Sequence, residues 1–166
     1  IVLLVALIVF QRAPDWPFFP IFFFALIVLM LFAGALAIGL SAVNVYLRDT
    51  QHLLEVALLG WFWLSAVAYP FGLVQEKLID RWGPGSEWLV ALNPVMVIVI
   101  TFQRTLYNPD YTGTSTSAQN EAASLPYHPW TWYMTLLGIA FAASVFLLFG
   151  ALALFSRLED NFAEEI

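Results

Sequence analysis

The chain has 166 residues, of which 61% are hydrophobic and only 11% are charged. Soluble domains are usually about 45–50% apolar and about 25% charged, so this composition indicates an integral membrane protein. The apolar runs along the chain predict that it is all-α and multi-pass. The sequence contains no cysteine, which excludes disulfides and thiol chemistry. Its formal charge of −6, without a basic patch, argues against nucleic-acid binding.

The first two elements are apolar segments separated by a proline-rich turn. Residues 1–10 are too short to cross about 30 Å of hydrocarbon, and we interpret them as the end of a membrane helix. Residues 21–40 carry no charge and are long enough to cross once as a helix. Gly34 and Gly39 lie in the second half of this helix, where small side chains allow another helix to approach closely.

A polar elbow follows at residues 41–55, and residues 56–74 are again uncharged. The elbow contains no Pro or Gly, so it can be helical, with polar side chains that face water or a partner protein. The apolar run over 56–74 predicts a further membrane helix. Pro70 should kink or end that helix, because proline lacks a backbone donor.

Residues 75–106 combine a short amphipathic segment with an apolar segment that is too short for an upright crossing. Asn93 followed by Pro94 predicts the start of a helix, with Asn as the cap and Pro in the first turn. An apolar helix of this length, bounded by turn signals, predicts a re-entrant or interfacial element.

The remaining chain alternates once more between polar and apolar segments. Residues 107–129 are rich in Thr, Ser, Asn and Pro and predict a mobile aqueous loop. Residues 130–155 predict the last membrane helix, which opens with tryptophans typical of the membrane interface. Residues 156–166 form an acidic tail. The Lys and Arg count leans weakly towards a cytoplasmic location for the long loop.

Several short motifs follow one another along the chain: Asn44, Tyr46, Arg48-Asp49, Tyr69-Pro70 and Leu92-Asn93-Pro94. Their order resembles that in the membrane subunit of type-2 ABC exporters. The most similar branch exports O-antigen, teichoic acid and other lipid-linked polysaccharides. The resemblance covers nearly the whole chain, although residues 107–129 are longer than the family pattern.

The resemblance implies a fold, an orientation and a set of partners. The chain would be the second part of a six-helix type-2 ABC exporter membrane domain, beginning in the third crossing, with a re-entrant external helical hairpin at 75–106. Residues 41–55 would be a cytoplasmic coupling elbow, 107–129 an external loop and 156–166 a cytoplasmic tail. A second copy of the chain and two ABC ATPase subunits would complete the transporter in a bacterial inner membrane, surrounded by membrane lipid.

The resemblance also implies roles for particular residues. A lipid-linked glycan would pass between two permease chains, while ATP and Mg²⁺ would bind only to the partner ATPase, so that no cofactor binds to this chain. The ATPase-coupling residues would be Asn44, Tyr46, Arg48, Asp49 and His52. The residues along the glycan path would be Trp61, Trp63 and Tyr69, unless they only contact lipid and the core. The residues of the external gate would be Trp88, Asn93 and Pro94.

Two other functions stay open. The chain has no Walker A sequence, so ATP hydrolysis belongs to a separate subunit. Another type-2 ABC exporter, for a drug, a peptide or another lipid, is the first alternative. A membrane glycosyltransferase or anchor protein is the second, and the absence of an Asp-x-Asp cluster argues against a metal-dependent transferase. His52 and Glu55 share a helical face but are too few for a metal site.

Overall fold

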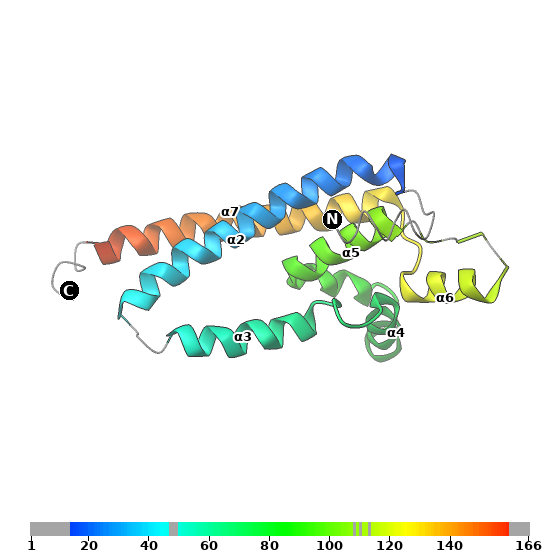
Figure 1. Ribbon diagram of the computed structural model, residues 1–166, viewed down its shortest axis with the longest axis horizontal. Coiled ribbons are helices and arrows are strands. Elements are labelled where there is room, and N and C mark those ends of the chain that lie inside the picture. The colour runs from blue at the N-terminus through cyan, green and yellow to red at the C-terminus, as the bar shows by residue number, and fades with distance from the viewer. Residues whose placement is uncertain (1–13, 47–49, 108, 110, 113, 160–166) are drawn as a thin grey trace.

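The structure is a computed structural model that describes residues 14–46, 50–107, 109, 111–112, 114–159 of the chain (Figure 1). All the regular elements in these ranges are helices, which confirms the prediction of an all-α protein. The first predicted segment, residues 1–10, lies outside the described residues. The elements in chain order are η1 (Trp16–Phe18), α2 (Phe19–Tyr46), α3 (Thr50–Leu64), α4 (Phe71–Trp82), η2 (Ser86–Leu92), α5 (Pro94–Tyr107), α6 (Thr116–Ser124) and α7 (Trp130–Glu159).

The two long apolar helices, α2 and α7, lie side by side and run in the same direction (Figure 1). Residues later in α2 contact residues later in α7, as expected for parallel helices. The Phe18 ring meets Tyr133 at 5.8 Å between centroids, and Phe24 meets Phe141 at 5.9 Å. A Cβ placed on Gly39 would lie 3.5 Å from the Ala151 Cβ, so the small residue does allow close approach there. Nothing lies within 4 Å of the same position on Gly34.

Among the described residues, α2 and α7 are the two helices long and apolar enough to cross a membrane, and the pair η2–α5 makes a third if it counts as one span. We call the end of the molecule where α2 and α7 begin the Trp130 end. The opposite end, where α2 finishes, α3 begins and α7 finishes, is the elbow end (Figure 1). The length and composition of these helices establish a membrane protein.

The predicted helix over residues 56–74 is not continuous, and this prediction is wrong. Helix α3 ends at Leu64, and the chain is irregular until α4 begins at Phe71. Ala66 has a φ of 50°, a left-handed conformation that a helix cannot contain. Pro70 adopts an extended conformation and precedes the first residue of α4, so proline marks the start of a new helix.

Helices η2 and α5 form a pair bent by 111° at Asn93. The cap expected at Asn93 is present, because its Oδ1 accepts a hydrogen bond from the Met96 backbone N–H at 3.3 Å. Much of α5 is buried, in contrast to η2, where only Val90 is buried. The bend therefore connects η2, which is mostly exposed, to α5, which is part of the core.

The polar segment predicted as a mobile loop over residues 107–129 contains a helix, so that prediction is wrong for residues 116–124. Ser115 caps α6 through its hydroxyl, which accepts a hydrogen bond from the Ala118 backbone N–H. The helix packs against α4 at Gly72 (Figure 1), where a Cβ would lie 1.8 Å from the backbone oxygen of Ala123. The contact with α4, which is distant in sequence, thus stabilises α6 although residues 116–124 contain few apolar side chains.

Replacing Gly72 with Ala should detach α6 from α4. The added methyl group collides with backbone atoms of Ala123, which cannot move aside as a flexible side chain would. Hydrogen–deuterium exchange of residues 116–124 should become several-fold faster. Gly60→Ala is the matched control, because nothing lies within 4 Å of a Cβ at Gly60. Unchanged exchange in the Gly72 variant would contradict the packing described here.

Candidate functional site

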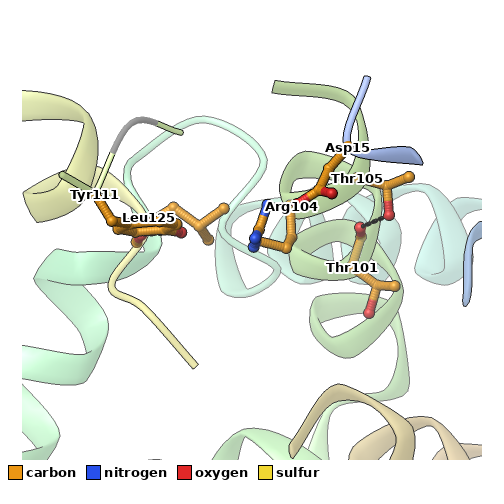
Figure 2. A network of polar contacts seen from close by, with 6 residues as sticks. All are labelled: Asp15, Thr101, Arg104, Thr105, Tyr111 and Leu125. Atoms are coloured by element: carbon orange, nitrogen blue, oxygen red, sulfur yellow. Dashed lines mark hydrogen bonds and ion pairs between the residues drawn. The ribbon is translucent and has the colours of Figure 1, made fainter. Parts of the chain in front are cut away.

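The best-defined polar site lies at the Trp130 end, where Arg104 of α5 meets Asp15, the residue before η1 (Figure 2). Arg104 Nη1 lies 2.7 Å from Asp15 Oδ2, and the two side chains are only 6% and 14% exposed. The backbone N–H of Asp15 also donates to the Thr105 carbonyl at 2.9 Å. One ion pair and one backbone bond therefore fasten the end of α5 to the start of α2.

Aromatic rings enclose the Arg104 guanidinium. Its Cζ lies 4.2 Å from the Phe18 ring centroid and 5.4 Å from that of Tyr111, distances suited to cation–π attraction. Figure 2 shows Arg104 between Asp15 on one side and Tyr111 with Leu125 on the other. The Tyr111 hydroxyl donates to the Leu125 carbonyl at 2.9 Å, and burial raises the pKa of Tyr111, so the hydroxyl keeps its proton. Arg104 thus connects three segments: the start of α2, the end of α5 and the 108–129 connection.

A second polar junction centres on Asn93 and joins α3 to α5. Trp61 Nε1 donates to Asn93 Oδ1 at 2.9 Å. Asn93 Nδ2 donates to the Leu64 carbonyl at 3.1 Å and lies 3.3 Å from Ser65 Oγ. One amide therefore caps α5 and holds the last turn of α3, where the backbone leaves the helix.

Trp132 is the centre of a third cluster, which joins α7 to α4 and η2. The His128 ring stacks on Trp132 with centroids 3.9 Å apart and an interplanar angle of 11°. The Trp88 and Phe71 rings contact the same indole at 6.1 Å and 6.3 Å. A ring nitrogen of His128 also lies 3.1 Å from Gln75 Oε1, which ties this connection to α4. Trp132 therefore sets the position of two elements against the start of α7.

Stability should fall as the pH drops below about 6.5, because His128 is held in its neutral form. Burial lowers the pKa of His128, and the charge of Glu87 opposes this with a smaller effect. A histidine with a lowered folded-state pKa stabilises the fold above its unfolded pKa of about 6.5, and this contribution disappears as the pH falls through the folded value. Unfolding followed by tryptophan fluorescence at pH 7.5 and pH 5.5 should show the loss.

The matched variant for this pH effect is His128→Gln, which cannot gain a proton in the range. The difference in stability between the two pH values should be smaller in the variant than in the native chain. An equal difference in both proteins would assign the pH dependence to other groups.

The predicted coupling residues lie at the elbow end, and the structure describes only some of them. Arg48 and Asp49 lie outside the described residues. Tyr46 is the last residue of α2, and the description does not extend to its side chain. Asn44 and His52 are exposed, on α2 and α3 respectively. Their proposed contact with an ATPase remains a prediction.

The residues predicted to line a glycan path have three different environments. Trp63 is 58% exposed on α3. Trp61 is half-buried, with its ring edge-on to Phe32 at 5.7 Å in addition to the bond with Asn93. Tyr69 is half-buried in the connection between α3 and α4, against the core. Trp61 therefore serves as a packing residue of the α3–α5 junction, and the role of the others in a path remains a prediction.

The predicted gate residues belong to the bent pair η2–α5. Trp88 lies on η2 and is 42% exposed, while Asn93 and Pro94 form the bend and the first turn of α5. No role was assigned to Arg104 or His128 from the sequence. A charge within an apolar helix was the available signal for Arg104, since such a charge usually has a partner. Nothing in the sequence pairs it with Asp15 in particular.

The polar side chains do not form a metal centre in the described part of the chain, where no three His, Asp or Glu side chains come together. The arrangement holds helices against one another. The Asn93 amide junction lies at the start of α5, and the Arg104 ion pair lies near its end. The chemistry of this arrangement is that of positioning.

Comparison with known proteins connects this arrangement to a class of permease. The chain is 28% identical over 154 residues to a protein of Myxococcus xanthus named O-antigen export system permease protein RfbA. The match covers 92% of this chain and 49% of that protein, so the chain spans about half the length of the curated relative. No family model and no solved structure matches the chain. The resemblance to polysaccharide-export permeases, indicated by the sequence motifs, is confirmed.

Proposed function

We propose that this chain, which resembles an O-antigen export permease, is part of the transmembrane subunit of an ATP-driven ABC exporter of lipid-linked polysaccharide. The observation that carries the proposal is the similarity to that permease over 92% of the chain. The partners would be an ABC ATPase that binds ATP and Mg²⁺, and a second copy of the permease. The glycan on its lipid carrier would pass between the two copies, across a bacterial inner membrane.

The parallel direction of α2 and α7 supports a re-entrant hairpin. Two parallel spans require an odd number of crossings between them. The chain leaves α2 at the elbow end and reaches α4 at the Trp130 end (Figure 1), so the segment that begins with α3 provides one crossing. The bent pair η2–α5 then adds none and must return to the side from which it started.

The contacts of the bent pair η2–α5 agree with a hairpin that begins and ends on the same side of the membrane. On its first arm, Trp88 meets Trp132 at the start of α7. On its second arm, the Thr105 carbonyl accepts from Asp15 at the start of α2. Both arms therefore contact the Trp130 end, and the bend at Asn93 points into the protein. In the proposed orientation this end faces outward, and η2 with α5 forms the external gate.

The α3–α5 junction suggests how an ATPase at the elbow would reach this gate. Helix α3 has fifteen residues and extends about 22 Å as a nearly rigid rod. Its end is bonded to Asn93, at the bend of the gate pair, and Gln103 of α5 donates to the Ala66 carbonyl at 3.4 Å. We propose that nucleotide-driven closure of the ATPases moves the elbow and α3, and that these bonds transmit the movement to α5.

Reconstitution of the full-length permease with its ATPase tests the proposed function. The two proteins should co-purify as a four-chain complex, and proteoliposomes should transport lipid-linked glycan only when ATP is present. A Walker-mutant ATPase is the control. Glycan movement without ATP, or a stable complex that moves other lipids but no glycan, would contradict the assignment.

A cysteine placed at Thr114, in the connection before α6, should react with a membrane-impermeant thiol reagent added to intact cells. The 166 residues contain no cysteine, so this part of the chain gives no background. Thr114 is exposed and belongs to the proposed external loop. A cysteine at Ser156, exposed at the elbow end of α7, is the matched control and should react only after permeabilisation. The reverse pattern would invert the proposed orientation.

A further inference from the structure

Helix α4 carries an open groove, whose lining residues other than Tyr69 have no role in the proposed transport function. The groove has a volume of about 440 Å³ and lies on α4, which is at the Trp130 end (Figure 1). Its residues come from one side of α4 and from the connection before it: Tyr69, Leu73, Val74, Lys77, Leu78, Arg81 and Trp82. We propose that this groove binds the headgroup phosphate of an anionic membrane phospholipid.

Charge is the first argument for this ligand. Lys77 and Arg81 are one helical turn apart, so they share a face of α4, and both are exposed. Neither forms an ion pair with another residue in the described part of the chain. The acidic residues of the same helix, Glu76 and Asp80, do not line the groove. Two unpaired cations therefore share one concave surface on a chain whose net charge is −6.

The apolar part of the groove is the second argument. Leu73, Val74 and Leu78 form a wall beside the two cations, and Trp82, 67% exposed, stands at the end of the helix. Tryptophan and tyrosine are enriched where membrane headgroups lie, and an amphipathic helix can lie in that plane. A phospholipid matches this division, with its phosphate on the cations and its glycerol and upper acyl carbons on the apolar wall.

The size of the groove favours a lipid over a protein. A stable protein interface buries about 800 Å² on each partner. The groove is formed by one face of a single helix, over about three turns, with the tyrosine before it, which suits one lipid. Helix α4 contacts Trp132, near the start of α7, through Phe71. The groove on α4 therefore lies close to the start of α7.

Trp82 provides a direct test, because bromine on a lipid acyl chain quenches a nearby indole. The full-length permease would be placed in nanodiscs that contain brominated phosphatidylglycerol or brominated phosphatidylcholine at equal amounts. The difference between native protein and Trp82→Phe isolates the fluorescence of Trp82. Quenching of Trp82 by the anionic lipid should exceed quenching by the zwitterionic lipid several-fold, because two surface cations attract anionic headgroups.

Two variants with the same loss of charge separate the groove from general surface attraction. Arg81→Gln should remove most of the preference for phosphatidylglycerol, and Arg157→Gln, at the elbow end, should leave it unchanged. Equal quenching by both lipids in the native protein, or equal effects of the two variants, would overturn the proposal. Inorganic phosphate at about 10 mM should not reduce the preference; if it does so while matched chloride does not, the site binds phosphate rather than lipid. The measurement needs no ATP or glycan, so its result is independent of the transport function.

Discussion

Replacing Arg104 with Gln should lower the free energy of unfolding by about 3–5 kcal/mol, a loss typical of breaking one side of a buried ion pair. The variant leaves the Asp15 carboxylate, 14% exposed, without its cationic partner. It also removes the cation that lies against the Phe18 and Tyr111 rings. Unfolding by increasing SDS in mixed micelles, followed by tryptophan fluorescence, measures the change.

The double variant Asp15→Asn with Arg104→Gln distinguishes ion pairing from packing. Two neutral amides leave no buried charge, so the double variant should recover a substantial part of the stability lost in Arg104→Gln. Arg157→Gln removes an exposed cation from α7 and should change stability by less than about 0.5 kcal/mol. If Arg104→Gln behaved like Arg157→Gln, the buried ion pair at the Trp130 end would not exist in the membrane.

The same variant has a functional meaning under the proposed transport mechanism. The ion pair and the neighbouring backbone bond fasten the second arm of the bent pair to the start of α2. A gate that has lost this attachment should leak or close poorly, whereas ATP hydrolysis, which occurs on another subunit, should continue. Export of glycan per ATP hydrolysed is therefore expected to fall more than the hydrolysis rate.

Hydropathy and length were sufficient to predict α2 and α7, because each must satisfy all its backbone groups inside an apolar solvent. The start of α5 was also predictable, since Asn as cap and Pro in the first turn are local chemistry. These features depend on residues within a few positions of one another. They can therefore be predicted without knowledge of the tertiary contacts.

Features that depend on distant residues could not be predicted. The break after Leu64 is held by amides of Asn93 and Gln103, which belong to another helix. The apolar composition of residues 56–74 gives no sign of it. Helix α6 exists in a polar stretch because Ser115 caps it and Gly72 leaves room for it on α4. In each case a tertiary contact overrides the local pattern.

The candidate site divides in the same way. The motif at Asn93 and Pro94 was found from sequence, and the structure adds what it joins. Arg104 and His128 were overlooked because a single charge or imidazole has no meaning until its partners are known, and Asp15 and Gln75 come from other segments. The coupling pair Arg48 and Asp49 still depends on the family resemblance.

Replacing Asn93 with Ala should lower the free energy of unfolding by about 2–4 kcal/mol and uncouple ATP hydrolysis from export. The variant removes the cap of α5 and leaves the Trp61 indole N–H without its acceptor. It also releases the last turn of α3, because the donor to the Leu64 carbonyl is lost. If α3 transmits movement from the elbow, a released α3 moves without carrying α5 with it.

Asn93→Asp keeps the cap of α5 but removes the hydrogen bonds that the Asn93 amide nitrogen donates at the end of α3. Aspartate caps a helix about as well as asparagine, and its oxygens still accept from Trp61 and Met96. It cannot donate to Leu64 or Ser65, so the end of α3 keeps only the Trp61 bond to the bend, while α5 stays capped. Helicity should therefore be retained while export per ATP falls, measured in the same proteoliposomes as the native protein. Full coupling in Asn93→Asp, with coupling lost only in Asn93→Ala, would mean that the bonds donated to Leu64 and Ser65 do not transmit the movement to the gate.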